Sequence, residues 1–146
     1  MQTKLRRSNR QDIPAIAGIY IQEFSKPPYN EPWTLEKALS KMRFFDQNYD
    51  LYTIQFGENI AGFVVVNPNF MCPGEVAFGE EFAISQEYQG RNIGTIVLKE
   101  LFEIYKERGY KRFLGIAARN SRALRLYEHL GFLPCEIDLL IEKKLD

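Results

Sequence analysis

Apolar residues recur at helical spacing near the start of the chain. Residues 13–25 carry them on one face, which predicts a helix with one buried side. Asp12 is its candidate N-cap, and Pro14 lies in its first turn. The prolines of the following "KPPYNEPW" segment cannot continue a helix. Thr34 can then cap a second helix that runs to about Phe45.

The period then changes from helical to alternating. Residues 50–66 form two apolar runs around "GEN", which predicts a β-hairpin. Residues 75–85 predict a third long strand, and Gly79 inside it indicates a bulge or a close backbone approach. The segment "LRRS" near the start is a short first strand.

The last third of the chain alternates helix and strand. A helix is predicted over residues 95–108, a strand over 111–118, and a helix from about 120 to 130. The apolar pattern of residues 133–145 predicts a closing strand. Early hairpins followed by helical crossovers indicate an α/β fold with a mixed sheet.

Composition narrows the class of protein. A chain of 146 residues fits one domain spanning 1–146. Nineteen basic residues balance nineteen acidic ones, which disfavours nucleic acid and membrane as partners. Cys72 and Cys135 fit no metal spacing, so no metal is expected and a reduced pair is the simplest interpretation. The polar start has no apolar signal region, so a cytoplasmic location is expected.

The stretch "EYQGRNIG" lies between the third long strand and the next helix. Gly90 and Gly94 allow the backbone N–H groups at the helix start to converge into an anion site, and Arg91 adds a cation. A plain tight turn is the alternative. The chain has no GxxxxGK[ST] phosphate loop, and this glycine pair comes too late in the chain for a dinucleotide fingerprint.

Two motifs together resemble the GNAT superfamily of N-acetyltransferases. "QGRNIG" resembles its acetyl-CoA pyrophosphate motif Q/R-x-x-G-x-G/A, with Asn92 standing where the family usually has its first glycine. Asn tolerates positive φ better than most residues. "NSRALRLYEHLGF" then matches the pattern N-x-x-A-x-x-x-Y-x-x-x-G-F. The resemblance implies the GNAT fold, a central mixed, mostly antiparallel β-sheet flanked by about four helices.

The resemblance also implies a reaction and a cofactor site. Acetyl-CoA is the implied cosubstrate. Its pantetheine would pair with the backbone of the strand at residues 75–85, which precedes the glycine loop at residues 89–94. A backbone N–H at the bulge of that strand would hold the oxyanion. Tyr127 falls on the family tyrosine and is the candidate acid that protonates the leaving thiolate, although its helical spacing alone fits a packed aromatic. Asn120 either contacts pantetheine or caps its helix. The implied cofactor-binding residues are Phe82, Ala83, Ile84, Gln89, Gly90, Arg91, Asn92, Ile93, Gly94, Thr95, Asn120 and Tyr127.

The acceptor amine needs a base, because an alkylamine with a pKa near ~10.4 is almost wholly protonated at neutral pH. Glu80 and Glu81 resemble the acidic pair on this strand in spermidine/spermine N-acetyltransferases. Glu80 is preferred because it alternates with Phe82 and Ile84, and water is the remaining alternative. The "PPYNEPW" segment suits an acceptor pocket or a rigid loop. Its candidate substrate-binding residues are Tyr29, Glu31 and Trp33.

The expected function is acetyl transfer from acetyl-CoA to a primary amine of a small molecule or peptide, by direct attack in a ternary complex. A covalent intermediate on Cys135 stays open. The alternatives are a non-catalytic acyl-CoA-binding sensor and a protein N-terminal or lysine acetyltransferase. Polyamine, aminoglycoside, amino acid and peptide acceptors all stay open. Dimers are common among GNAT proteins, so a homodimer is a further expectation of the resemblance.

Overall fold

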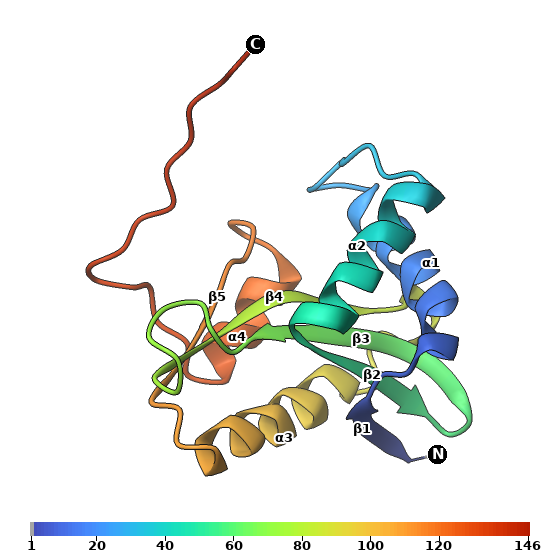
Figure 1. Cartoon of the computed structure of the whole chain (residues 1–146), viewed down its shortest axis with the longest axis horizontal. Helices are drawn as coiled ribbons and strands as arrows, with labels where there is room; N and C mark the ends of the chain where they lie inside the picture. The colour runs from blue at the N-terminus through green and yellow to red at the C-terminus, as the bar shows by residue number, and fades with distance from the viewer. Residues whose placement is uncertain (1) are drawn as a thin grey trace. The chain divides into compact units, whose positions relative to one another are not determined.

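The computed structural model describes residues 2–146 and divides them into two units. The first ends at Ile116, and the second is Ala117–Asp146. The first unit contains a five-stranded sheet in the order β1-β2-β3-β4-β5 (Figure 1). Its strands are β1 (Thr3–Arg7), β2 (Asp50–Phe56), β3 (Asn59–Asn67), β4 (Val76–Ile84) and β5 (Arg112–Gly115). Neighbouring strands are antiparallel except β4 and β5, which are parallel.

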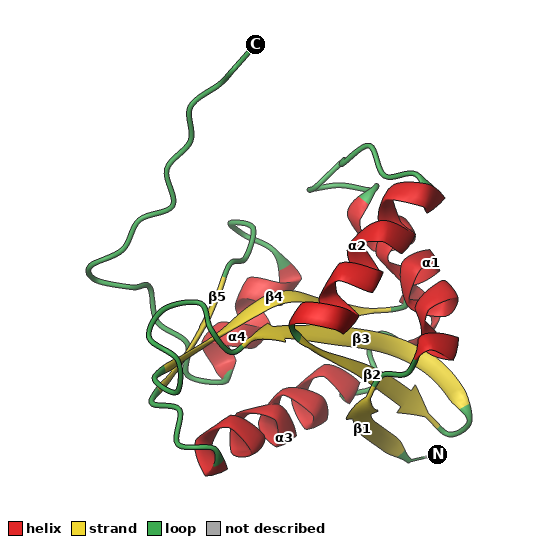
Figure 2. Cartoon of the chain, viewed as in Figure 1, coloured by secondary structure: helices red, strands yellow, loops and turns green. Residues whose placement is uncertain are grey.

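Helices cover both faces of this sheet (Figure 2). One face carries α1 (Ile13–Phe24) and α2 (Leu35–Asn48), and the other carries α3 (Ile93–Glu107). Short 3-10 turns are η1 (Arg10–Asp12) and η2 (Gln86–Tyr88), and α4 (Arg122–His129) lies in the second unit. The predicted fold class is therefore confirmed. The single-domain prediction stays a prediction.

The core follows the periodicities of the sequence. Under α1 and α2, Ile16, Phe63 and Val65 are fully buried. Beneath α3, the hydroxyls of Tyr52 and Tyr105 lie 3.0 Å apart in a buried contact. As predicted, Thr34 caps α2, its hydroxyl accepting from the Lys37 N–H. Helical spacing on the helices and alternation on the strands thus direct their apolar side chains into two layers.

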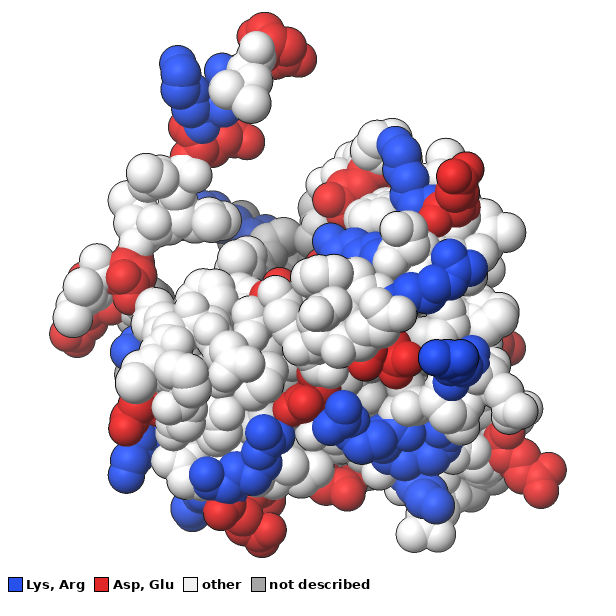
Figure 3. All heavy atoms as spheres, viewed as in Figure 1, with Lys and Arg blue, Asp and Glu red and all other residues white. Residues whose placement is uncertain are grey.

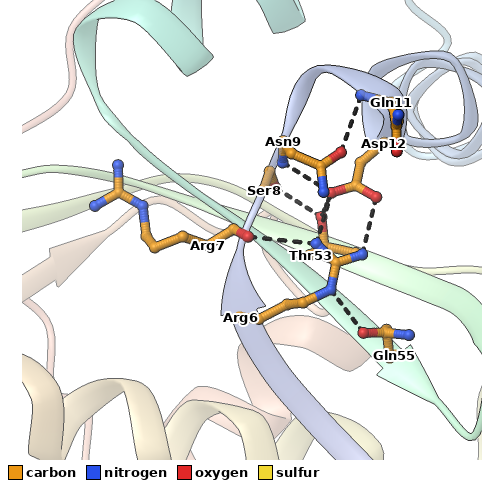
Figure 4. A network of polar contacts seen from close by, with 8 residues as sticks. All are labelled: Arg6, Arg7, Ser8, Asn9, Gln11, Asp12, Thr53 and Gln55. Atoms are coloured by element: carbon orange, nitrogen blue, oxygen red, sulfur yellow. Dashed lines mark hydrogen bonds and ion pairs between the residues drawn. The ribbon is translucent and has the colours of Figure 1, made fainter.

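Asp12 occupies the N-cap position of α1, as predicted, but its side chain makes no capping bond because it belongs to a polar network that joins β1, η1 and β2 (Figure 4). Asp12 accepts two hydrogen bonds from the Arg6 guanidinium, at 2.7 and 2.9 Å. It also accepts one from the Thr53 hydroxyl at 3.1 Å and one from the Asn9 N–H at 2.9 Å. Asn9 is the N-cap of the 3-10 turn η1, its side chain accepting from the Gln11 N–H. The Arg6 guanidinium holds the pKa of the Asp12 carboxyl below its ordinary value.

Asp12→Ala is expected to lower the free energy of unfolding by about 2–3 kcal/mol, since it removes a carboxylate bound by charged and neutral donors. Arg6 keeps part of its exposure and regains some hydration, which limits the loss. Urea unfolding at neutral pH measures the change. Because the Asp12 pKa is lowered on folding, its contribution is present above the ordinary Asp pKa and is lost as the pH falls through the folded pKa, below about 4.

The matched control is Asp46→Ala, because Asp46 in α2 forms no ion pair within the described residues. Equal destabilisation by the two variants would show that the network around Asp12 adds nothing to the free energy of unfolding.

The predicted closing strand over residues 133–145 is wrong. The structure assigns residues 133–146 to neither helix nor strand, and their apolar side chains are exposed, Ile137 and Leu145 by 94% each. A strand needs a neighbouring strand for its backbone hydrogen bonds, which an apolar pattern along the sequence does not supply.

Candidate active site

One edge of β4 lies open where the site residues were predicted. β5 pairs with β4 only from Val76 to Gly79, whereas β3 continues along the other edge to Ile84. From Glu80 onward, no strand among residues 2–146 pairs with that second edge. The backbone groups of an open edge can bind an extended chain of amides as an added strand.

The bulge predicted at Gly79 is present. Val65 pairs with Glu81 and Val66 with Gly79, which leaves Glu80 as the extra residue on β4. A side chain at Gly79 would also meet the Phe113 ring of β5 at 3.1 Å. The bulge breaks simple alternation, so counting back from Phe82 does not decide which glutamate faces the site.

The two glutamates have different surroundings. Glu80 accepts a hydrogen bond from the Asn67 side chain at 3.3 Å, whereas Glu81 accepts one from the Tyr20 hydroxyl of α1 at 3.2 Å. Burial raises the pKa of Glu81 to about 7, against the opposing influence of Lys41 and the Tyr20 bond. The charges of Glu31 and Glu80 are smaller contributions to the same rise. A carboxyl with this pKa can accept and release a proton near neutral pH.

The predicted acceptor loop lies close to Glu81. The pKa of Tyr29 is raised by burial and then by the charges of Glu81 and Glu31. Trp33 packs edge-on against Tyr20, with ring centroids 4.5 Å apart, and its indole N–H donates to Glu31 at 3.2 Å. Aromatic and acidic side chains from α1, β4 and the loop before α2 therefore form one cluster, which is the candidate acceptor site.

Sequence reasoning missed two members of this cluster. Tyr20 counted only as part of an apolar stripe, although a tyrosine among aliphatic residues is a signal that its hydroxyl needs a partner. Its pKa is raised well above the ordinary range, first by burial and then by the charge of Glu81. Lys41 gave no signal within its polar helix, yet its ammonium lies over the Tyr20, Trp33 and Phe45 rings.

The loop after β4 is tied to its neighbours by Gln89. The Gln89 amide donates to the Ile84 carbonyl at 2.8 Å and to Glu23 of α1 at 3.0 Å. Gly90 has a φ of 78° and Asn92 a φ of 64°, so Asn92 takes the left-handed conformation expected of it. These two positive φ values turn the chain from the end of β4 into the start of α3.

The start of α3 has features of an anion site. Asn92 is the N-cap but makes no side-chain capping bond, and Ile93 beneath it is 2% exposed. Gly94 and Thr95 follow as the second and third helical residues, where N–H groups lack intrahelical acceptors. Arg91 stacks over the Phe56 and Tyr88 rings, 5.4 and 5.7 Å from their centroids.

The second unit holds the other motif. Ser121, and not Asn120, caps α4, its hydroxyl accepting from the Leu124 N–H at 3.0 Å, so the capping alternative for Asn120 is wrong. Asn120 instead has a positive φ of 60°. The Tyr127 ring lies 5.3 Å from that of Phe132, centroid to centroid.

Further findings on the described residues concern metal binding, the cysteines, membrane crossing and surface charge. No group of three or more His, Cys, Asp or Glu residues within 2–146 is placed to hold a metal. Both cysteines are exposed and unpaired. No helix in the described part is long and apolar enough to cross a bilayer. Basic and acidic side chains are interspersed on the face drawn in Figure 3.

Sequence comparison decides the family. The pattern of the acetyltransferase (GNAT) family matches residues 14–132, a span that includes the β4 bulge, the glycine loop and Tyr127. The chain belongs to the GNAT family. The predicted family is thereby confirmed.

Curated relatives agree with this membership. The chain is 28% identical over 125 residues to YycN, an uncharacterized N-acetyltransferase of Bacillus subtilis (strain 168), covering 77% of this chain and 79% of that protein. It is 31% identical over 80 residues to MJ1207, an uncharacterized N-acetyltransferase of Methanocaldococcus jannaschii, covering 52% of this chain and 35% of that protein.

Solved structures share the fold. A possible acetyltransferase from Clostridium difficile 630 matches over 100% of both chains, with a TM-score of 0.83 and 10% identity. AAC(6')-Iy, crystallised with the bisubstrate analog CoA-S-monomethyl-acetylneamine, matches over 99% of both chains, with a TM-score of 0.74 and 14% identity. At these identities the likeness concerns the GNAT fold alone.

Proposed function

We propose that this GNAT protein transfers an acetyl group from acetyl-CoA to a primary amine, by direct attack in a ternary complex. The observation that carries the proposal is Glu81, a carboxyl with a pKa of about 7 beside an aromatic, acidic loop and on a strand with an open edge. A relative of the same fold was crystallised with a CoA bisubstrate analog, which supports acetyl-CoA as the cosubstrate.

Glu81 is the proposed base, in preference to Glu80. The acceptor ammonium gives its proton to Glu81, and the neutral nitrogen attacks the thioester carbon. A backbone N–H at the β4 bulge holds the oxyanion. The C–S bond then breaks, and the thiolate takes a proton from Tyr127. The nitrogen, which became cationic on attack, loses its extra proton to water as the amide forms. Tyr127 regains a proton from water, and Glu81 releases its proton to the solvent. Glu80 acts through its charge, which raises the pKa of Glu81.

Acetyl-CoA binds in two proposed parts. Pantetheine lies along the open edge of β4, against the backbone of Phe82, Ala83 and Ile84, and contacts Asn120. The pyrophosphate lies at the start of α3, where backbone N–H groups and the helix dipole favour an anion. The residues proposed around the pyrophosphate are Gln89, Gly90, Arg91, Asn92, Ile93, Gly94 and Thr95.

The deciding experiment is release of free thiol from acetyl-CoA in the presence of a panel of amines, with mass spectrometry of the products. Transfer to a small amine supports the proposal. Binding of acetyl-CoA without transfer to any amine or peptide would favour the sensor alternative. Transfer to protein amines alone would favour a protein acetyltransferase.

Gly94→Val is expected to weaken acetyl-CoA binding more than tenfold, or ~1.4 kcal/mol, because a side chain at the start of α3 keeps the pyrophosphate from the backbone. Isothermal titration calorimetry measures the affinity. Gly18→Val is the matched control: Gly18 is also helical, no atom lies within 4 Å of where its Cβ would be, and it lies away from the glycine loop in sequence. If folded Gly94→Val binds acetyl-CoA as tightly as the wild-type protein does, the proposal that the pyrophosphate binds at this loop is wrong.

A further inference from the structure

Lys41 is a cation held inside the proposed acceptor site. Its ammonium nitrogen lies 5.3 Å from the centroid of Trp33, 5.5 Å from that of Phe45 and 5.9 Å from that of Tyr20. The side chain is half-buried. Within residues 2–146 it forms no ion pair at 4.0 Å or less. Its charge is therefore offset by aromatic faces and by no adjacent carboxylate.

Lys41 and Glu81 both adjoin Tyr20. Tyr20 links them, since its ring lies under the Lys41 ammonium and its hydroxyl donates to Glu81 at 3.2 Å. Lys41 is also the strongest influence favouring the ionised form of Glu81. The site thus presents a carboxylate for an amine and an ammonium that is not held in an ion pair of 4.0 Å or less.

This pair of charges discriminates among acceptors. A polyamine or an aminoglycoside carries several cations, and Lys41 would repel those that do not reach Glu81 or Glu31. A molecule with an amine and a carboxylate satisfies both charges, and its carboxylate forms a charge-assisted hydrogen bond with Lys41. The Tyr20 and Trp33 rings beside the ammonium lower the local polarity, which strengthens such a contact.

We propose that the acceptor is a small amino acid or a close analogue, whose amine faces Glu81 and whose carboxylate binds Lys41. This inference rests on the proposed acetyl transfer and narrows its acceptor class. Lys41 is then the residue that determines specificity, while Glu81 takes the proton. The carboxylate contact is made before the reaction and kept through it, so it acts mainly on KM.

The test compares each amino acid of a panel with its own amide, which keeps the amine and removes the negative charge. Values of kcat/KM are measured for wild type, Lys41→Gln, Lys41→Arg and Arg43→Gln. The measured quantity is the ratio of acid to amide within each protein, compared between proteins. That comparison cancels the difference in amine pKa between acid and amide, and it cancels the general effect of Lys41 on Glu81.

We expect wild type to acetylate at least one amino acid, and Lys41→Gln to lower the acid-to-amide ratio about tenfold or more, mostly through KM. Lys41→Arg should keep most of the preference. Arg43→Gln, which removes an exposed cation from the same helix, should leave the ratio unchanged.

Two results overturn the inference while leaving acetyl transfer intact. One is acetylation of amines with no preference for a carboxylate. The other is a preference that Lys41→Gln does not reduce. If the protein acetylates no amine at all, the proposed function is wrong, and the inferred acceptor class is wrong as well.

Discussion

Tyr127→Phe is expected to lower kcat by about 10²–10⁴ while the affinity for acetyl-CoA is kept. A tyrosine with a pKa near ~10 is suited to protonate a departing thiolate, and phenylalanine fills the same space without the proton. The Tyr127–Phe132 ring contact should survive the change, because it needs no hydroxyl. Initial rates at saturating acetyl-CoA and acceptor give kcat, and calorimetry gives the affinity.

Tyr110→Phe is the matched control for that loss. The Tyr110 hydroxyl donates to the Pro68 carbonyl at 3.0 Å, so the variant also removes one bonded hydroxyl, from a residue with no proposed role in the reaction. Its kcat should stay within about threefold of wild type. A loss of less than about threefold in Tyr127→Phe would leave Tyr127 as a packing residue of α4 and Phe132.

Local rules predicted much of the scaffold. The stripe of α1, the Thr34 cap and the β2–β3 hairpin depend on residues close in sequence, and all were predicted correctly. The bulge near Gly79 and the left-handed Asn92 also followed from single residues with unusual backbone freedom. These features need no knowledge of distant contacts.

Features that depend on distant partners were not predicted. Asp12 has cap chemistry, but Arg6 and Thr53 compete for its carboxylate. The apolar pattern of residues 133–145 is present, but no neighbouring strand supports it. The choice between Glu80 and Glu81 depends on which of the two glutamates Tyr20 and Lys41 approach. Tyr20 lies on α1, 61 positions from Glu81 in the sequence, and Lys41 lies on α2.

The pH dependence of the reaction should report Glu81. Its carboxyl must be ionised to take a proton, so the rate should rise through about pH 7, the pKa to which burial raises it, and then level off. Glu80→Gln should keep this rise and shift it to lower pH, because the charge of Glu80 raises the Glu81 pKa. Glu31→Gln should shift it in the same direction, and should also weaken acceptor binding.

Glu81→Gln should abolish that rise and lower kcat by about 10²–10⁴ near neutral pH. The deficit should shrink toward pH ~9.5, where more of the amine is neutral without help. Rates from about pH 6 to 9.5 for the three glutamine variants decide the assignment. A wild-type profile in Glu81→Gln together with a crippled Glu80→Gln would restore Glu80 as the base, as strand alternation suggested. Three wild-type profiles would leave deprotonation to water.

Stability gives a second, independent reading of Glu81. A carboxyl whose pKa rises from 4.5 to about 7 on folding stabilises the folded state in its protonated form, and that advantage is lost as the pH rises through the folded pKa. At pH 9 the ionised carboxylate costs the folded state about 3 kcal/mol, at ~1.4 kcal/mol per pKa unit. Glu81→Gln removes this cost, so the variant should unfold at a higher temperature than wild type at pH 9, with a smaller difference at pH 5. An inactive variant that is also less stable at both pH values would mean that Glu81 holds the site together and does not serve as its base.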